Sequence, residues 1–242
     1  MRTLIIADIH ANFDALRALP HADFIICAGD VVTFGAEPAA CIDWLLSSDA
    51  VCVRGDEDDA VAHGTDYPLP AHLSRSGVEC RRWTRTMLSP KHMAWLSALL
   101  PEMEVPFDGA RIGVVHGYPG DYNRYLKPTP EELDRLTRAF PRADLIVVGH
   151  THRAGVWRHR GKLVVNPGSV GQSAHPGKAS YALYEGGRIT LGLAPYMLDR
   201  AVAKLGYSSL DPGAQVACIH ELQRGSVRPD DRLGPITRTV PA

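Results

Sequence analysis

The stretch TLIIADIH, Thr3 to His10, is an apolar run that ends in an aspartate and a histidine. Its unbroken series of aliphatic residues is typical of a buried strand. Further along the chain, short runs of the same kind alternate with amphipathic stretches, as in DFIICAG followed by PAACIDWLL. This alternation is the β-α-β rhythm of a layered α/β fold, and it predicts parallel strands joined by helices.

Residues of the kind that bind metals follow five such apolar runs, each at the point where the predicted strand ends. In an α/β sheet the carboxyl ends of the strands share one edge, so residues that are far apart in sequence converge there. One pocket can therefore hold seven side chains: Asp8, His10, Asp30, Asp56, His116, His150 and His152.

Each of these stretches has a structural explanation when it is taken alone. Asp8 and His10 fit a capped turn, and Asp30 fits a turn after a glycine. The acidic run of VRGDEDD, Asp56 to Asp59, fits the first turn of a helix, where the backbone dipole is positive. Chance does not explain the whole set, because Asp and His rarely follow five buried strands without a function.

The donor types indicate which metals the pocket would bind. Imidazole and carboxylate without thiolate suit manganese, iron, zinc or nickel better than calcium or copper(I). Seven donors in one pocket favour two ions that share a bridging carboxylate over a single ion.

Size and composition limit the other possibilities. The chain has 242 residues, of which 45% are hydrophobic and 22% charged, as in a single globular α/β domain. It has no apolar run of about 18 residues and no signal-peptide pattern, so we expect no membrane contact and a cytoplasmic location. The formal net charge of -1 gives no sign of non-specific nucleic-acid binding. The sequence predicts no particular oligomeric state.

The middle and end of the chain have clear helix and hairpin signals. Two helices are predicted over 78–88 and 89–100, the second with Ser89 as its N-cap. A third starts with a capping box between Thr129 and Glu132. Turn residues predict hairpins around 108–109, 160–161 and 186–187, and the last two imply an antiparallel component beside the parallel one.

We therefore expect one domain over 1–242, with a helical insertion at about 70–100 and a C-terminal helical tail at about 197–242. The residues after the last predicted helix are expected to be a weakly ordered tail.

The order of these motifs resembles the calcineurin-like metallophosphoesterase superfamily. ADIHANFDAL, GDVVTFGAEP and VVNPGSVGQ are similar in particular to its small bacterial phosphodiesterases and phosphatases. The resemblance covers nearly the whole chain. It implies a four-layer α-β-β-α sandwich of two mixed sheets flanked by helices, with a dinuclear metal centre.

Carried over by position, the resemblance assigns a role to each ligand. Asp8, His10 and His152 would hold one ion, Asp30 would bridge, and the second ion would take the remaining three ligands, Asp56, His116 and His150. It also implies that a water or hydroxide oxygen attacks phosphorus in line. Manganese is the expected metal, with iron, zinc or nickel as alternatives.

The chain departs from the family pattern in its acidic run. Asp56 stands where the family has asparagine, and Glu57 stands where some relatives have a histidine that protonates the leaving group. Asp58 matches the second acid of the motif, and Asp59 is expected to be solvated. The predicted catalytic residues are therefore Asp30, Asp56, Glu57 and Asp58, although Glu57 qualifies as an acid only if burial raises its pKa.

Two further residues are candidates for contact with a substrate. Arg54 is placed to hold a phosphate oxygen, and it is explained equally well as a surface arginine. Asn12 is placed to reach the substrate or to cap a helix. The loop 166–172 is expected to support the ligand histidines rather than to bind phosphate. Three tyrosines near His116 line the entrance or lie on the surface: Tyr118, Tyr122 and Tyr125.

These observations predict metal-dependent hydrolysis of phosphoester bonds, with a small phosphodiester or a nucleotide as the substrate. The alternatives are a phosphomonoesterase, including a Ser/Thr-type protein phosphatase, and a dinucleoside polyphosphate hydrolase. A non-catalytic scaffold on the same fold is the alternative from a different class, because fold alone does not establish function.

Overall fold

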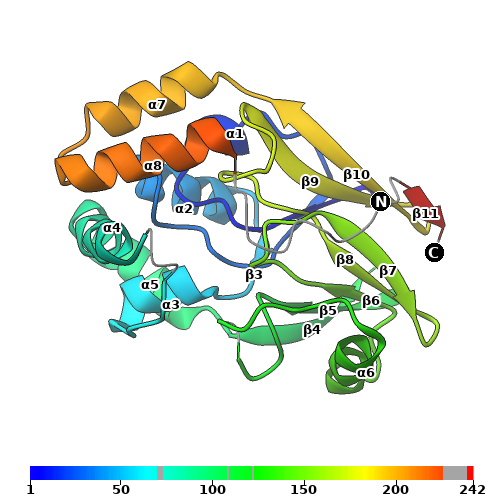
Figure 1. Ribbon diagram of the computed structural model, residues 1–242. Helices are drawn as coiled ribbons and strands as arrows, with labels where there is room; N and C mark the ends of the chain where they lie inside the picture. The colour runs from blue at the N-terminus through cyan, green and yellow to red at the C-terminus, as the bar shows by residue number, and fades with distance from the viewer. Residues whose placement is uncertain (70–72, 108, 122, 226–238, 242) are drawn as a thin grey trace.

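Two β-sheets pack face to face and carry helices on both outer surfaces (Figure 1). The computed structural model describes residues 1–69, 73–107, 109–121, 123–225 and 239–241. The predicted four-layer α-β-β-α sandwich of mixed sheets is confirmed.

The first sheet contains the three N-terminal strands on one side, with β1 in the interior and β3 at the edge. Its strand order is β11-β10-β9-β1-β2-β3, in which β1, β2 and β3 run parallel and the others antiparallel. The bounds of its strands are β1 Thr3–Ile6, β2 Phe24–Cys27, β3 Val51–Cys52, β9 Lys178–Glu185, β10 Arg188–Pro195 and β11 Thr239–Pro241.

The second sheet has the order β4-β5-β6-β8-β7, and its parallel strands are β5, β6 and β8. Its strands are β4 Glu102–Phe107, β5 Ala110–Val115, β6 Leu145–Val147, β7 Gly155–His159 and β8 Lys162–Asn166. The two hairpins that we expected to form one antiparallel component are therefore divided: β9-β10 extends the first sheet and β7-β8 belongs to the second.

Side chains of β1 alternate between two cores. Leu4 and Ile6 point towards the helices outside the first sheet, whereas Ile5 and Ala7 lie between the two sheets. The period of two places a fully buried side chain on each face, and burial of one isoleucine contributes about 1.5–3 kcal/mol. The run that opens the chain is thus apolar throughout because both faces of its strand are covered.

Helices cover the sheets from both sides (Figure 1). α6 packs on the outer face of the second sheet, and α1 and α2 pack on the first. The helices are α1 Phe13–Leu16, α2 Pro38–Ser47, α3 Asp56–His63, α4 Ser74–Met87, α5 Pro90–Ala98, α6 Pro130–Ala139, α7 Leu198–Gly206 and α8 Pro212–Arg224.

Two of the three predicted helices begin where expected, whereas the helix predicted over 78–88 is α4, Ser74–Met87, and begins four residues earlier. Ser89 caps α5, and its hydroxyl accepts from the His92 N–H. The Thr129 hydroxyl accepts from the Glu132 N–H at 3.4 Å, which is half of the predicted capping box. The other half is replaced, because the Glu132 carboxylate binds Arg124 and the Lys127 N–H while the Thr129 N–H donates to the Lys127 carbonyl.

The helices α4, α7 and α8 form a helical lobe with a small core of its own. This core contains Trp83, Leu205 and Cys218, and it also takes in Phe34 from the loop after β2. The Trp83 indole N–H donates to the Ser209 hydroxyl at 3.0 Å, so its polar edge is satisfied.

The prediction of a weakly ordered tail after the last helix falls mainly on residues outside the described part of the chain. Residues 226–238 and 242 are among these, as are 70–72 at the start of the predicted insertion. Thr239–Pro241 forms β11, which pairs with β10 and lies at the edge of the first sheet.

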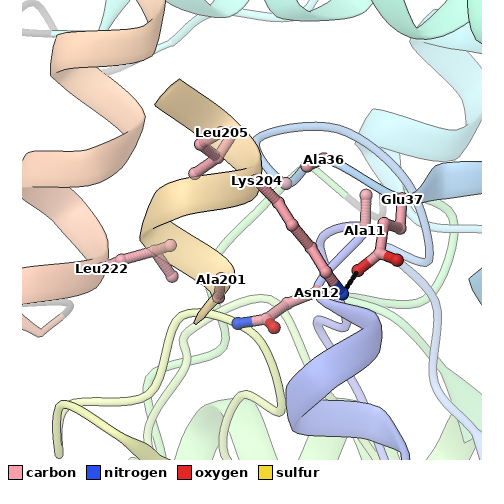
Figure 2. A pocket seen from close by; sticks show the side chains of 9 residues that line it. Ala11, Asn12, Ala36, Glu37, Ala201, Lys204, Leu205 and Leu222 are labelled. Atoms are coloured by element: carbon pink, nitrogen blue, oxygen red, sulfur yellow. Dashed lines mark hydrogen bonds and ion pairs between the residues drawn. The ribbon is translucent and has the colours of Figure 1, made fainter. Parts of the chain in front are cut away.

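Ion pairs join α7 to α1 and to the N-cap residue of α2. Lys204 lies 2.6 Å from the buried carboxylate of Asp14 and 2.5 Å from that of Glu37. Figure 2 shows the lysine reaching Glu37 across a small cavity, with Asn12 on its floor. Asp14 also lies 3.3 Å from Arg200, so a carboxylate with almost no solvent contact has two cations from α7.

We expect the Lys204→Met variant to lose about 1–3 kcal/mol of unfolding free energy, because a buried carboxylate loses a charged partner while the aliphatic stem remains. Denaturant unfolding measures this loss. The matched control is Lys91→Met on the exposed face of α5, which we expect to change stability by less than about 0.5 kcal/mol. Equal effects of the two substitutions would contradict this account.

Candidate metal centre

All seven predicted ligands follow the carboxyl ends of parallel strands, and they converge as expected. Asp8, His10 and His152 form one cluster, the first half-site. Asp30, Asp56, His116 and His150 form another, the second half-site, and all seven residues are buried. The strands that deliver them are β1, β2 and β3 from one sheet and β5 and β6 from the other.

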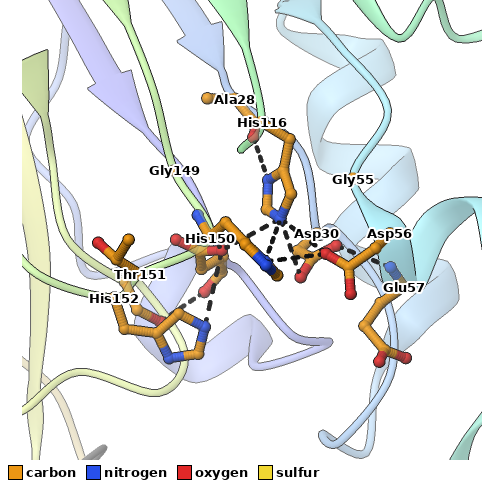
Figure 3. A network of polar contacts seen from close by, with 12 residues as sticks. Ala28, Asp30, Gly55, Asp56, Glu57, His116, Gly149, His150, Thr151 and His152 are labelled. Carbon is orange, nitrogen blue, oxygen red and sulfur yellow. Dashed lines mark hydrogen bonds and ion pairs between the residues drawn. The ribbon is translucent and has the colours of Figure 1, made fainter. Parts of the chain in front are cut away.

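Donor atoms within the second half-site lie at distances that suit one cation. The Asp56 Oδ1 atom is 2.9 Å from His150 Nδ1 and 3.1 Å from His116 Nε2, and the two imidazole nitrogens are 3.2 Å apart (Figure 3). Ligands that bind Zn²⁺ at about 2.0–2.2 Å are separated by roughly these distances. The donor set therefore fits a first-row divalent ion.

Asp30 links the two half-sites. Its Oδ2 atom lies 3.3 Å from His116 Nε2 and 3.8 Å from His10 Nε2. In the first half-site the Nε2 atoms of His10 and His152 are 3.0 Å apart, and His152 Nε2 is 3.7 Å from Asp8 Oδ1. One carboxylate thus faces both sets of nitrogens, as a bridging ligand must.

Most of the ligands have a backbone conformation that side-chain-bearing residues rarely adopt. Positive φ angles of 47–65° occur at five of the seven: Asp8, His10, Asp30, His150 and His152. Each such residue costs energy, and a fold retains it where the surroundings and the function require it. The strained loops turn the side chains inward immediately after the strands end.

Hydrogen bonds across the two sheets fix the ligands. His116 from the second sheet contacts the Ala28 carbonyl of the first through Nδ1 at 2.6 Å, which leaves Nε2 for a cation. The backbone N–H of His150, which follows a strand of the second sheet, donates to Oδ1 of Asp8, which follows a strand of the first, at 3.1 Å. The centre therefore lies on the seam between the sheets.

The loop 166–172 supports the ligand loops, as predicted. The Asn166 amide donates to the Gly149 carbonyl at 2.8 Å and to the Thr151 hydroxyl at 3.0 Å, on both sides of His150. The Ser169 hydroxyl donates to the Asp8 carbonyl at 2.7 Å.

The electrostatics of the second half-site reflect its crowding. Burial alone would raise the pKa of Asp56, but the imidazoles of His150 and His116 hold it well below its usual range. Burial alone would lower the pKa of His116, but Asp30 and Asp56 raise it well above its usual value. A proton on His116 thus competes with a cation, so cation affinity rises with pH.

The four acids of the opening turn of α3 have four different environments. Asp56 is in the second half-site. Asp58 accepts from the N–H groups of Gly55, Val31 and Val32, and burial raises its pKa to about 7. Glu57 pairs with Arg81 of α4 at 2.7 and 3.0 Å, outside both half-sites. Burial raises the pKa of Glu57 to about 8.

The expectation that Asp59 is solvated is wrong. Its side chain is 7% exposed and accepts from Thr65 and Tyr67, with Arg54 and His63 close by. The Asp59 side chain lies between α3 and the segment that follows it. The four polar side chains named above take the place of solvent around its carboxylate.

The proposed substrate residues have structural partners. Arg54 Nε lies 3.0 Å from Asp59, and an Arg54 Nη1 atom contacts the Ser97 carbonyl. Asn12 caps α1 by accepting from the Ala15 N–H, and its amide donates to the Gly171 carbonyl. The expected capping role of Asn12 is confirmed, and its contact with a substrate stays a prediction.

Sequence reasoning missed two residues that hold the site. Asn123 contacts Asp56 and His150, and Arg81 pairs with Glu57. No motif signals them, because Asn123 meets Asp56 and His150, and Arg81 meets Glu57, only in the folded chain. Of the three tyrosines, Tyr125 stacks on His150, Tyr118 lies in the core beside α6, and Tyr122 is outside the described residues.

Glycine is required directly before Asp56. A Cβ on Gly55 would lie 2.1 Å from Asp30 Oδ1 and 2.5 Å from the Asp30 nitrogen. Any side chain here would displace the Asp30 carboxylate, which explains the glycine that precedes the acidic run.

Comparison with known proteins identifies the family. Residues 1–187 match the sequence profile of the Calcineurin-like phosphoesterase superfamily domain, and this match spans most of the chain. The chain therefore belongs to the calcineurin-like phosphoesterase superfamily, and it is a hydrolase. In the described part of the chain, every helix is too short or too polar to cross a membrane.

The chain is also similar to individual proteins. The protein MJ0912 of Methanocaldococcus jannaschii is 28% identical over 205 residues, which cover 75% of this chain and 81% of that protein. The structure of a metallophosphoesterase from Sphaerobacter thermophilus matches with a TM-score of 0.75 at 26% identity, over 91% of this chain and 99% of the other. Protein PH1004 from Pyrococcus horikoshii OT3 matches with a TM-score of 0.78 at 18% identity, over 93% and 99%, and shows the fold alone.

The Glu57–Arg81 pair generates a stability prediction. We expect Arg81→Met alone to cost about 1–3 kcal/mol of unfolding free energy, because it leaves the buried carboxyl group of Glu57 without its hydrogen-bonding partner. The double variant Glu57→Leu/Arg81→Met should lose less than Arg81→Met does. Chemical denaturation of the four proteins in the cycle measures the coupling, and strictly additive losses would show that the pair does not act as a unit.

Proposed function

We propose that this protein is a phosphodiesterase that hydrolyses small phosphodiesters or nucleotides at a dinuclear divalent-metal centre, with Mn²⁺ as the metal. The observation that carries the proposal is a third buried carboxylate, Asp56, inside the second half-site. Its pKa is held below the usual range, so it contributes a full negative charge.

The two clusters supply the residues that would hold the ions. Asp8, His10 and His152 would hold one, the second half-site the other, and Asp30 would bridge them. Bound divalent ions would supply positive charge that lowers the pKa of water and stabilises the charge developing on phosphoryl oxygens. The mixed imidazole and carboxylate set suits manganese, iron, zinc or nickel.

Charge balance favours diesters. Two divalent ions with three carboxylates leave a formal charge of about +1, and an asparagine at position 56 would leave about +2. The lower charge reduces the attraction for a dianionic monoester more than the attraction for a monoanionic diester. The third carboxylate thus shifts selectivity between two phosphoester classes without contacting the carbon groups of either.

The leaving group also matters. Glu57 directly follows Asp56 in the chain. Its two carboxyl oxygens accept hydrogen bonds from the Nε and Nη2 atoms of Arg81. We assign Glu57 to anchoring α3 on α4 rather than to donating a proton. Esters with good leaving groups should therefore react faster than those that release an alkoxide.

We expect removal of metal to abolish hydrolysis and Mn²⁺ to restore it. The measurement compares initial rates on bis(4-nitrophenyl) phosphate and 4-nitrophenyl phosphate after chelation and after addition of Mn²⁺, with bound metal counted by elemental analysis. The diester should be the faster substrate. Protein that binds metal yet hydrolyses neither ester would favour a scaffold, and a faster monoester would favour a phosphomonoesterase.

Asp56→Asn tests the charge argument. One charge at about 6 Å in an effective dielectric of about 40 contributes about 1.4 kcal/mol, so the ratio of monoester to diester kcat/KM should rise about tenfold. Asp59→Asn is the matched control, because it removes a carboxylate from the same helical turn but outside both half-sites. An unchanged ratio in Asp56→Asn, or an equal rise in both variants, would refute the role of Asp56.

A further inference from the structure

The loop between β5 and α6 makes hydrogen bonds to the second half-site through Asn123. Its side-chain amide donates to Asp56 Oδ2 at 3.3 Å. Its backbone carbonyl lies 3.0 Å from His150 Nε2 and accepts the proton carried there. A single residue from outside both half-sites therefore binds two of the four ligands of the second.

The two contacts select which atoms face the centre. A proton on His150 Nε2 leaves the lone pair on Nδ1, and that nitrogen lies 2.9 Å from Asp56 Oδ1 and 3.2 Å from His116 Nε2. The amide occupies Asp56 Oδ2, so Oδ1 is the atom that joins the nitrogens. Each ligand thus presents one defined donor atom.

An aspartate at position 56 needs such a partner. A carboxylate has two equivalent acceptor oxygens and no donor, so it cannot fix its own orientation by donating to the surrounding backbone. Asp56 is 5% exposed, and the cations near it are imidazoles that would be neutral when they bind a metal. The Asn123 amide then provides a neutral donor that holds the free oxygen without competing for the metal.

Tyr125, two residues further along the loop, holds His150 from another side. Its ring stacks on the imidazole with centroids 4.3 Å apart and planes at 13°. Two residues of this loop therefore hold the His150 ring: Tyr125 stacks on its face, and the Asn123 carbonyl binds its Nε2 atom.

We propose that Asn123 is a positioning residue of the second half-site, which orients Asp56 and His150 and thereby sets the affinity for the second ion. This inference rests on the proposed dinuclear centre. Groups that orient metal ligands typically contribute 10–100-fold in metal affinity, so the effect should be of that order.

Calorimetric titration of metal-stripped protein with Mn²⁺ tests the proposal. Asn123→Ala, which keeps the backbone carbonyl, should weaken one of the two binding events about tenfold or more and leave the other unchanged. Asn123→Leu, close to asparagine in shape but without a donor, should behave like alanine, whereas Asn123→Gln should recover part of the affinity. Lys127→Ala, an exposed residue of the same loop, is the matched control and should bind like wild type.

Activity supplies a second readout. The hydrolysis lost in Asn123→Ala should return as Mn²⁺ is raised, because the defect lies in occupancy, and a general loss of structure would not respond in this way. Unchanged affinity in Asn123→Ala, or equal weakening of both events with a lowered melting temperature, would overturn the inference. Wild-type protein that binds two Mn²⁺ ions but hydrolyses neither ester would instead overturn the proposed function and leave the role of Asn123 intact.

Discussion

The mutual repulsion of three buried carboxylates is the constraint that the rest of this structure accommodates. Asp8, Asp30 and Asp56 lie with four imidazoles in a space almost closed to water, where unpaired charges are costly. Positive charge is required there, from protons on histidine or from cations. The two sheets place their parallel strands so that the carboxyl ends meet at this point, and the loops take up left-handed backbone conformations to bring the donors together.

A single helical turn shows how densely this region is used. Four consecutive acids begin α3, and each has a separate function in the fold. Asp56 faces the imidazoles, Glu57 binds α4 through Arg81, Asp58 ties the helix start to the loop after β2, and Asp59 closes the corner at the far side. Because Asp58 binds the loop after β2 and the Glu57 backbone N–H donates to the Asp30 carboxylate, this turn fixes Asp56 relative to Asp30.

Sequence patterns predicted the strand ends well because ligand placement at a sheet edge follows from local features: an apolar run, its end, and an acid or histidine. They could not predict the partners of Glu57 and Asp59. Arg81 is 24 residues from Glu57, and the polar groups around Asp59 come from a segment without a motif. The assignment of each hairpin to a sheet was likewise hidden, because strand pairing depends on long-range packing. Asn123 escaped notice for the same reason.

Phe34 connects the candidate metal centre to the core of the helical lobe. Its ring meets the His10 imidazole edge-on, with centroids 5.4 Å apart, and its other contacts lie in the core of the helical lobe. The part of the chain that defines the family ends at residue 187, before α7 begins. A fragment cut there would retain every candidate metal ligand but lose α7 and α8, which form part of the apolar core around Phe34. The C-terminal helices therefore contribute to the packing of the loop that carries Asp30 and Phe34.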